Sequence, residues 1–262
     1  MSKICPLFSS SSGNCTYIET KDGAILIDAG VSFKKIKDAV ESVGGDIGNI
    51  KAVCVTHEHT DHITGLKTLL NKTDAVLCAS SKTLDALANL EKIPEKTKII
   101  ELDRGSYDIF NMAINRFATS HDCEGSSGYN IILPDDKKFT LCTDLGVVTD
   151  EVRLALKGSD LVLLESNHDI EMLRKGPYSN DLKVRIMSDK GHISNVACAS
   201  ELKILLNDGT ERFILGHLSA KNNTTLIARS CAEAALMDLS AENGKDYLLS
   251  VAAPEKNGVT IL

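Results

Sequence analysis

Residues 56–62 read THEHTDH and place four potential metal ligands within six positions, namely His57, His59, Asp61 and His62. Strand-like alternation puts His57 and His59 on one side of an extended segment. Asp61 and His62 then fall at the start of the following helix, where a carboxylate can face the helix amides. Three imidazoles and a carboxylate packed this closely can hardly all be hydrogen-bonded within the protein. The cluster therefore predicts a metal site, with a polar, helix-capping turn as the alternative.

Polar side chains also follow several other predicted strands. The strand-like runs lead into His57, His121, Asp144, Asn167, His168 and His217. Side chains that lie just beyond strand ends meet in a shared crevice in α/β proteins. A single histidine after a strand is usually an ordinary loop residue, but the recurrence indicates one common site.

The elements that must position these residues are short strands and helices. Residues 15–20 and 24–30 flank Lys-Asp-Gly and predict a hairpin, and apolar spacing predicts a helix from Ile63 to Leu70. Other strands are expected at 51–56, 75–80, 98–102, 111–118, 129–133, 138–143, 160–165, 211–215 and 247–251. Other helices are expected at 32–43, 81–90, 149–156, 194–206 and 224–239. Grouped strands that later interleave with helices predict a layered α/β fold with mixed sheets.

Composition narrows the class of protein. The chain has 262 residues, 43% of them hydrophobic, and no internal repeat, so we expect one domain over residues 1–262. No segment resembles a secretory signal, and the apolar runs fall short of the roughly 20 residues that span a bilayer, so no membrane is expected. Eight scattered cysteines indicate reduced thiols and a cytoplasmic protein. The net charge of −7 does not favour general nucleic-acid binding, although a local basic groove is compatible with it.

The pattern H-x-H-x-D-H after a strand resembles the signature of the metallo-β-lactamase fold hydrolases. Asp28, His121, Asp144 and His217 follow the order of that family, which implies a four-layered αββα sandwich with two mixed β-sheets. FSSSSGNC (8–15), ESNHD (165–169), GHISN (191–195) and GHLS (216–219) further resemble the small bacterial YycJ/WalJ group. That resemblance implies a 5′→3′ DNA exonuclease linked to mismatch repair.

The same resemblance implies a ligand set. His57, His59 and His121 would bind one ion, Asp61, His62 and His217 a second, and Asp144 would bridge them. Nitrogen and oxygen donors suit Zn²⁺ or Mn²⁺, and also Fe²⁺. Two such ions about 3.5–4 Å apart can hold a bridging hydroxide, a nucleophile at neutral pH. Asp61 would also orient the attacking water. Asp28 is expected to orient a ligating imidazole, with a turn aspartate before Gly30 as the alternative.

Phosphodiester cleavage expels a poor alkoxide leaving group, so a nearby acid helps. His192 is not needed as a ligand and resembles the histidine that phosphodiesterases of the superfamily place near the scissile group. Glu165 resembles its acidic partner. The alternatives are a loop histidine and a strand-end carboxylate. Ser194 can cap the helix at 194–206, whose amides would attract a phosphate, and His168 is expected to support the site or contact substrate, with a plain loop role equally open.

Residues 171–190 carry five basic and three acidic side chains around Gly176, Pro177 and Tyr178. They predict a loop, including Lys190, that follows a nucleic-acid backbone while Tyr178 stacks on a base. An ordinary solvated loop is the alternative. Ser9 to Ser12, with Gly13 and Asn14, could offer amides and hydroxyls near the site, or form a plain turn. Only 72 residues separate Asp144 from His217, which excludes an inserted domain of the β-CASP type that RNA-processing relatives carry.

Three functions compete. The first is a dimetal nuclease. The second is a carbonyl hydrolase, a lactonase or thioesterase, on the same metals; it would need no leaving-group acid at His192 and would have an apolar pocket. The third is a metal-binding scaffold without catalysis, and the intact ligand set argues against it because decayed sites usually lose ligands first.

Overall fold

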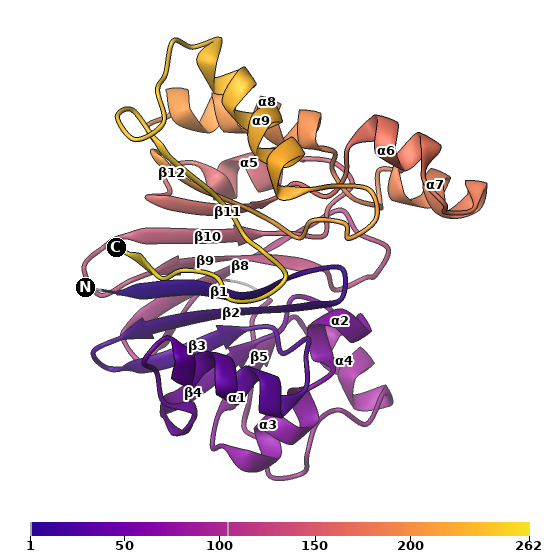
Figure 1. Ribbon diagram of the computed structural model, residues 1–262. Helices are drawn as coiled ribbons and strands as arrows, with labels where there is room; N and C mark the ends of the chain where they lie inside the picture. The colour runs from indigo at the N-terminus through magenta and orange to yellow at the C-terminus, as the bar shows by residue number, and fades with distance from the viewer. Residues whose placement is uncertain (1, 104) are drawn as a thin grey trace.

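Two sheets lie face to face in the computed structural model, which describes residues 2–103 and 105–262 (Figure 1). Within the described residues, the N-terminal sheet has seven strands in the order β14-β1-β2-β3-β4-β5-β6. Its strands are β1 (Lys3–Ser10), β2 (Gly13–Thr20), β3 (Gly23–Ile27), β4 (Ile50–Cys54), β5 (Val76–Ala79), β6 (Ile99–Glu101) and β14 (Thr260–Ile261). Neighbours β1, β2 and β3 pair antiparallel, whereas β3, β4, β5 and β6 pair parallel, so the sheet is mixed.

The C-terminal sheet is also mixed and has the order β13-β12-β11-β10-β9-β8-β7. Its strands are β7 (Ser106–Ile109), β8 (Met112–Ala118), β9 (Ser127–Ile132), β10 (Lys138–Cys142), β11 (Leu161–Glu165), β12 (Arg212–Gly216) and β13 (Leu248–Val251). The pairs from β7 to β10 are antiparallel, and those from β10 to β13 are parallel. The parallel strands leave their carboxyl ends at one edge of the sheet, where the polar loops follow.

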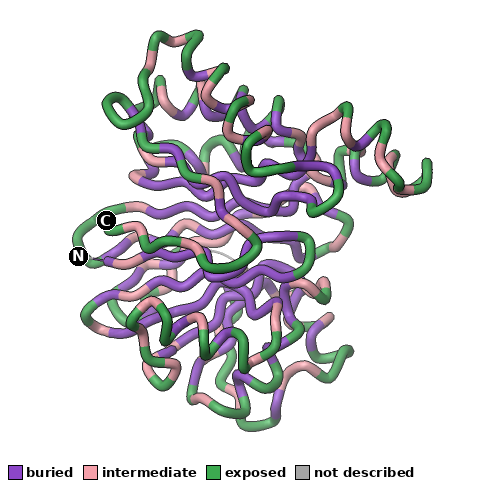
Figure 2. The backbone as a smooth tube through the Cα atoms, in the orientation of Figure 1, coloured by how far each residue is buried: buried purple, intermediate pink, exposed green. Residues whose placement is uncertain are grey.

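Helices cover the outer face of each sheet. The N-terminal sheet carries α1 (Phe33–Ser42), the 3₁₀ turn η1 (Ile47–Asn49), α2 (Thr60–Ile63), α3 (Leu66–Lys72) and α4 (Ser81–Asn89). On the other side α5 (Asp150–Leu156), α8 (Asn195–Asn207) and α9 (Thr225–Met237) cover the sheet, while α6 (Ile170–Lys175) and α7 (Asn180–Ile186) project beyond the ends of its strands. Figure 1 shows the two helical groups at opposite faces of the paired sheets, and Figure 2 shows the strands between them as largely buried. The expected αββα sandwich with two mixed sheets is confirmed.

Strand alternation explains why three apolar layers fill this sandwich. In β3, Ile25 and Ile27 point into the layer between the sheets, whereas Ala24 and Leu26 point toward the N-terminal helices. Successive strand side chains alternate between faces, so a strand that is apolar throughout is buried on both. A third apolar cluster, which includes Leu202 of α8, fills the space under the C-terminal helices.

Most of the predicted elements are confirmed, including the β2–β3 hairpin, whose strands pair antiparallel across residues 21 and 22. The helix expected from Ile63 to Leu70 is divided, because α2 ends at Ile63 and α3 begins at Leu66. Strand β1 was not predicted from the sequence. It contains Pro6, at which the pairing with β2 shifts register, and a proline in a strand is tolerated at such an irregularity.

Residues 171–190 were expected to form a basic loop, and this expectation is wrong. Helices α6 and α7 occupy most of this segment, with Asp169 and Ser179 as their N-caps, and only residues 176–179 connect them. The two helices are short, so their apolar spacing is too brief to stand out in the sequence. Tyr178 lies in the connection, and the prediction that it stacks on a base within an extended loop loses its structural basis.

No described helix, in residues 2–103 or 105–262, combines the length and the apolar character that a bilayer crossing requires. All eight cysteines are free, and six of them are buried. Burial raises the pKa of several thiols, including Cys5 to about 11. These thiols are protonated and poorly reactive, as the sequence-based expectation of reduced, packed cysteines requires.

Candidate metal centre

The polar residues singled out in the sequence lie on the loops that follow strands. Asp28 follows β3, His57 follows β4, His121 follows β8, Asp144 follows β10 and His217 follows β12. These loops meet at one edge of the sandwich, so residues separated by up to 189 positions, from Asp28 to His217, are brought to one region. His59 is the N-cap of α2, and Asp61 and His62 lie within its single turn.

Three of the strand-end residues have a left-handed backbone. The angle φ is 64° at Asp28, 59° at Asp144 and 53° at His217. Such angles are uncommon outside glycine, although Asp and His adopt them more readily than most residues. They turn the chain abruptly at the end of its strand, and each of these side chains is directed into a buried polar cluster.

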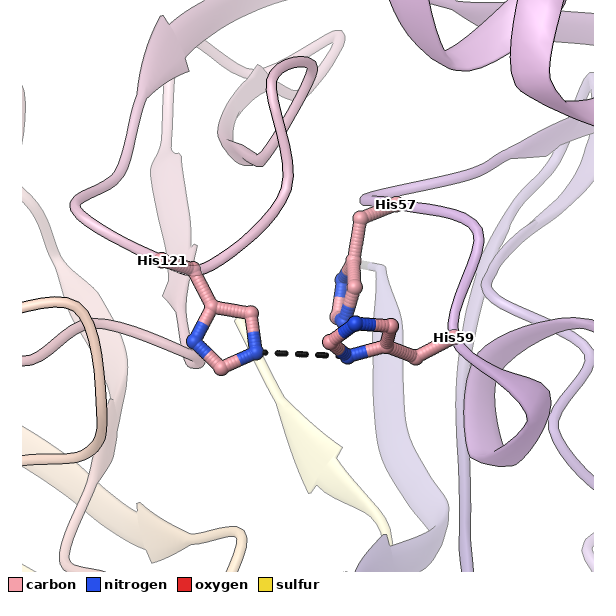
Figure 3. Close-up of side chains that lie close together, drawn as sticks. All are labelled: His57, His59 and His121. Carbon is pink, nitrogen blue, oxygen red and sulfur yellow. Dashed lines mark hydrogen bonds between the residues drawn. The ribbon is translucent and has the colours of Figure 1, made fainter. Parts of the chain in front are cut away.

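The first cluster consists of His57, His59 and His121, whose ring nitrogens converge (Figure 3). One donor atom from each lies within 4.8 Å of the other two. The closest recorded pair is His121 Nε2 and His59 Nδ1, at 3.3 Å. His57 and His121 are buried, while His59 is partly exposed at the mouth of the site. The outer nitrogen of His121, Nδ1, lies 3.1 Å from the Gly191 carbonyl oxygen, which fixes the ring orientation.

The second cluster consists of Asp61, His62 and His217 and has the same 4.8 Å limit. Asp144 lies between the two clusters. Its Oδ2 is 3.4 Å from His62 Nε2 and 3.3 Å from His217 Nδ1, while its Oδ1 is 3.8 Å from His121 Nε2. The two oxygens of this carboxylate therefore face different clusters, which is the arrangement that the bridging expectation requires.

These donors fit divalent metal ions. Two nitrogens bound at about 2.0–2.1 Å in tetrahedral geometry are about 3.3 Å apart. The closest donor pairs of both clusters have this spacing, at 3.3 to 3.5 Å. Moreover, His57 Nε2, Asp144 Oδ2 and His217 Nδ1 are buried without a hydrogen-bond partner among the described residues. Buried polar atoms are costly when left unpaired, so convergence of three of them indicates that an ion completes the site.

Two of the proposed ligands, His57 and Asp144, have pKa shifts that suit metal binding. Burial lowers the pKa of His57 well below its ordinary value, which keeps this imidazole neutral. Burial raises the pKa of Asp144, but His217 and His62 outweigh this effect and hold the pKa well below its ordinary value. The carboxylate therefore stays ionised. Neutral imidazoles and ionised carboxylates are the forms that bind metals. The burial of this carboxylate among imidazoles therefore favours a bound cation.

Asp28 lies beside His62, where its carboxylate can orient the ring. Its Oδ2 lies 2.7 Å from His62 Nδ1, and its Oδ1 accepts a 2.8 Å hydrogen bond from the Thr56 amide. A proton held on Nδ1 by this carboxylate leaves the Nε2 lone pair free to bind a metal ion on the side of Asp144 and Asp61. Thr56, which sequence reasoning missed, completes the arrangement because its hydroxyl lies 3.0 Å from His57 Nδ1 and 3.1 Å from His62 Nδ1.

His192 and Glu165 form a pair beside both clusters. His192 Nδ1 lies 2.8 Å from Glu165 Oε1, and the fully buried carboxylate is held through Oε2 by the amides of Leu145 and Ile193. The His192 ring lies 5.0 Å from that of His121 and 5.4 Å from that of His217, between centroids. Burial lowers the pKa of His192, but Glu165 and Asp144 raise it to about 9. The ring is therefore protonated at neutral pH.

The remaining candidates lie at different distances from this centre. Ser194 caps α8 by accepting a 3.2 Å hydrogen bond from the Ala197 amide, as predicted. His168 is buried beside it, and the two residues form a bridge between backbone segments. Lys190 is exposed, and only its backbone, next to Gly191, adjoins the metal-binding residues. No contact in the described structure brings the Lys190 side chain into the site.

Asp122 was missed because no local pattern marks it, whereas Asn14 and Ser9 belong to the serine-rich segment that was expected near the site. Asp122 Oδ1 lies 3.3 Å from His121 Nε2 and 3.6 Å from His59 Nε2, and its Oδ2 binds Arg185 of α7 at 2.6 Å from Nε. Asn14 Nδ2 lies 3.3 Å from Asp61 Oδ2. The Ser9 hydroxyl accepts a 2.9 Å hydrogen bond from the His217 amide, in agreement with the suggestion that the serine-rich segment adjoins the site.

This sandwich with a His- and Asp-rich centre at its strand ends defines a class of metal-dependent hydrolases. The sequence profile of the metallo-beta-lactamase superfamily matches residues 10–217, and the chain belongs to that superfamily. It is 36% identical over 257 residues to exodeoxyribonuclease WalJ of Streptococcus pneumoniae strain D39, an alignment that covers 97% of this chain and 95% of the relative.

It is also 36% identical over 225 residues to exodeoxyribonuclease YycJ of Bacillus anthracis, covering 85% of this chain and 84% of that protein. The expected YycJ/WalJ-type subgroup is thereby confirmed. Among solved structures, the metallo-beta-lactamase fold protein YhfI from Bacillus subtilis superimposes with a TM-score of 0.73 at 14% identity, over 100% of both chains. At that identity the likeness concerns the fold alone.

Proposed function

We propose that this protein is a 5′→3′ exodeoxyribonuclease of the cytoplasm that cleaves phosphodiester bonds with two divalent ions, zinc or manganese, or else iron. The observation that carries the proposal is the His192–Glu165 pair beside the two donor clusters, because a phosphodiesterase needs an acid there and a carbonyl hydrolase does not. The names of the WalJ and YycJ relatives support an exonuclease that acts on DNA and, with it, a role in DNA repair.

The ligand assignment follows the two clusters. His57, His59 and His121 would hold one ion, Asp61, His62 and His217 the other, and Asp144 both. Divalent ions bound there supply a hydroxide nucleophile at neutral pH and stabilise negative charge on the phosphate. Asp28 would hold the Nδ1 proton of His62, so that the Nε2 lone pair remains available to the ion.

The chain's own residues handle the proton. His192 directs Nδ1 at Glu165, which leaves Nε2 as the atom that gives a proton to the departing O3′ of the DNA. Glu165 keeps the ring oriented and stabilises its protonated form. Asp61, at the exposed edge of the second cluster, is placed to accept a hydrogen bond from the attacking water, in addition to its role as a ligand.

The DNA end is the proposed target because the chain between Asp144 and His217 forms only β11, β12 and helices α5 to α8. We propose that no inserted domain lies over the site and that residues 1–262 act as one domain. The basic residues of α6 and α7 are candidates for contacts with the backbone of the strand, although as two helices and not as a loop.

The decisive experiment digests 5′-³²P-labelled single-stranded and duplex DNA, and the matching RNA, with protein loaded with Mn²⁺ or Zn²⁺. A 5′→3′ exonuclease releases the labelled mononucleotide at the first turnover, whereas cleavage from the other end gives a ladder of shortening labelled strands. Chelated protein and the Asp144→Asn variant serve as controls. Bis(p-nitrophenyl) phosphate, a lactone and a thioester are assayed in parallel, and hydrolysis of the last two alone would establish a carbonyl hydrolase instead.

A further inference from the structure

His59 is the most exposed histidine of the first donor cluster. The other two histidines are buried, and each has a hydrogen-bond partner on the ring nitrogen that it turns away from the cluster. This outer nitrogen lies 3.0 Å from the Thr56 hydroxyl in His57 and 3.1 Å from the Gly191 carbonyl oxygen in His121. The side chain of His59 is 34% exposed, so its orientation depends on whichever group faces its own outer nitrogen.

The group that faces this nitrogen is Asp122. His59 Nδ1 lies 3.3 Å from His121 Nε2, the spacing of two donors to one ion, so Nδ1 is the donor and Nε2 is the outer nitrogen (Figure 3). His59 Nε2 lies 3.6 Å from Asp122 Oδ1. A neutral imidazole that binds an ion through one nitrogen carries its proton on the other. The proton of His59 would therefore lie on Nε2, where the Asp122 carboxylate can accept a hydrogen bond from it.

Asp122 is in turn fixed by Arg185 of α7. Arg185 Nε donates a 2.6 Å hydrogen bond to Asp122 Oδ2, and Nη2 of the same guanidinium contacts that oxygen as well. Because both contacts use Oδ2, Oδ1 remains turned toward the histidines. Among the described residues, Asp122 belongs to none of the donor groups that could share an ion, which distinguishes it from the proposed ligands.

The C-terminal end of α7 packs closely against the first cluster. The turn after the helix folds back onto it, with a 2.9 Å hydrogen bond from the His192 amide to the Ile186 carbonyl oxygen. A Cβ atom at Gly191 would collide with the carbonyl oxygens of Arg185 and Ile186, so this close approach requires glycine. The Gly191 carbonyl oxygen then faces His121. The end of α7 and its turn therefore adjoin the first cluster at two points, the Arg185 side chain and the Gly191 carbonyl.

We propose that Asp122 is a positioning residue for the first metal ion and that Arg185 holds it in place, so that α7 sets how tightly this ion is bound. The inference rests on the proposed metal assignment. Asp28 faces the outer nitrogen of His62 in the second cluster in the same way. The carboxylate at the first cluster differs because it is held by a helix that carries basic residues proposed to contact DNA.

The test is the affinity for Zn²⁺ in each of the two binding steps, measured by competition with a chelating dye and without substrate. The step that His59→Ala removes belongs to the first cluster. Asp122→Asn should weaken that step about 10–100-fold, the usual effect of losing a partner that orients a ligand, and leave the other step unchanged. Arg185→Met should weaken the same step about tenfold. Arg185→Lys keeps the charge and one donor, so it should weaken the step less.

The sign of the Arg185→Met effect is decisive. The substitution removes a positive charge near a bound cation, and Coulomb's law alone would make Zn²⁺ bind more tightly. Tighter binding is also expected if Asp122 is simply another ligand, because the substitution frees its carboxylate from the guanidinium. Tighter or unchanged binding of Zn²⁺ in the first step would therefore overturn the proposal.

Lys183→Met is the matched control. It removes a positive charge from the same helix, but Lys183 Nζ donates its hydrogen bond to the Arg174 carbonyl oxygen, at 2.9 Å, and not to Asp122. Both zinc affinities should remain at the wild-type value. A loss in this control as large as that in Arg185→Met would assign the effect to α7 as a whole and remove the specific role of the ion pair.

Circular dichroism melting of the metal-free variants checks the fold. The Arg185 side chain is 51% exposed, and exposed ion pairs contribute little to stability, so the Arg185 variants should melt at the wild-type temperature. They decide the test if Asp122→Asn does not fold. Wild-type protein that binds no divalent ion would remove the metal centre and the nuclease proposal together. Two bound ions with an unaltered first step in the variants would leave the nuclease proposal standing and remove the positioning role.

Discussion

Replacing His192 with alanine should separate acid catalysis from metal binding. The ring directs Nδ1 at Glu165 across 2.8 Å and lies beside His121 and His217 without being needed to complete either donor cluster. The variant therefore removes a proton donor and leaves the seven proposed ligands in place. Metal content should remain at the wild-type level, while cleavage of DNA slows.

The size of the effect depends on the leaving group. Proton transfer by a positioned side chain contributes about 10²–10⁴-fold, which corresponds to about 2.7–5.4 kcal/mol of barrier. The full loss is expected with DNA, because the departing O3′ would leave as an unstable alkoxide. A p-nitrophenolate departs without a proton, so hydrolysis of bis(p-nitrophenyl) phosphate should slow by about tenfold or less.

The assay is the ratio of kcat/KM for the two substrates, measured for wild-type and variant protein beside metal analysis by mass spectrometry. An equal loss on both substrates would refute acid catalysis, because a proton donor matters only to the poorer leaving group. A loss of bound metal in the variant would also contradict the prediction, because His192 would then contribute to metal binding. His192 also shares a potential ligand cluster with Asp144, Glu165 and His217, and would then be a ligand.

Further predictions address the ligands and the fold. Asp144→Ala should lower occupancy of both ions, as metal analysis measures; full occupancy would exclude a bridging role. Asp28→Asn should weaken metal affinity about 10–100-fold, because the carboxylate orients His62; competition with a chelating dye measures this, and unchanged affinity would contradict it. Burial raises the pKa of Glu201 in the folded protein, which Arg153 only partly offsets. The stabilising contribution of Glu201 is therefore present at low pH and is lost as pH rises through the folded pKa. The free energy of unfolding of Glu201→Gln, measured with urea relative to wild type, should accordingly increase from pH 4 to pH 7. A decrease over the same range would show that the Arg153 ion pair dominates.

The ligand cluster was predictable because part of it is local. His57, His59, Asp61 and His62 lie within one turn of chain, so their chemistry is visible in a few letters of sequence. The distant residues were recognisable only as polar groups after strands, and the family resemblance ordered them. Asp122 escaped prediction because its importance arises from Arg185, which reaches it from α7, 63 positions away in the chain. Contacts of that kind exist only after the helices have packed.

The fold was predictable where apolar residues recur at regular spacing over a long segment. The strands of the hairpin and the long helix α8 were found, whereas α6 and α7, with six and seven residues, were read as loop. Their caps, Asp169 and Ser179, were legible helix-start residues, but the basic composition and Pro177 suggested irregular chain. Strand β1 was missed for a related reason, since Pro6 normally argues against a strand unless an irregularity accommodates it.

The hydrogen bond from the His217 amide to Ser9 joins the first strand of the fold to the last of the proposed ligands. During synthesis the N-terminal sheet leaves the ribosome first, carrying His57 to His62. A nascent chain that has not yet reached residue 217 holds an incomplete set of donors and an unpaired Ser9. Nuclease activity should therefore arise only when translation is nearly finished, so that an incomplete chain does not cleave DNA.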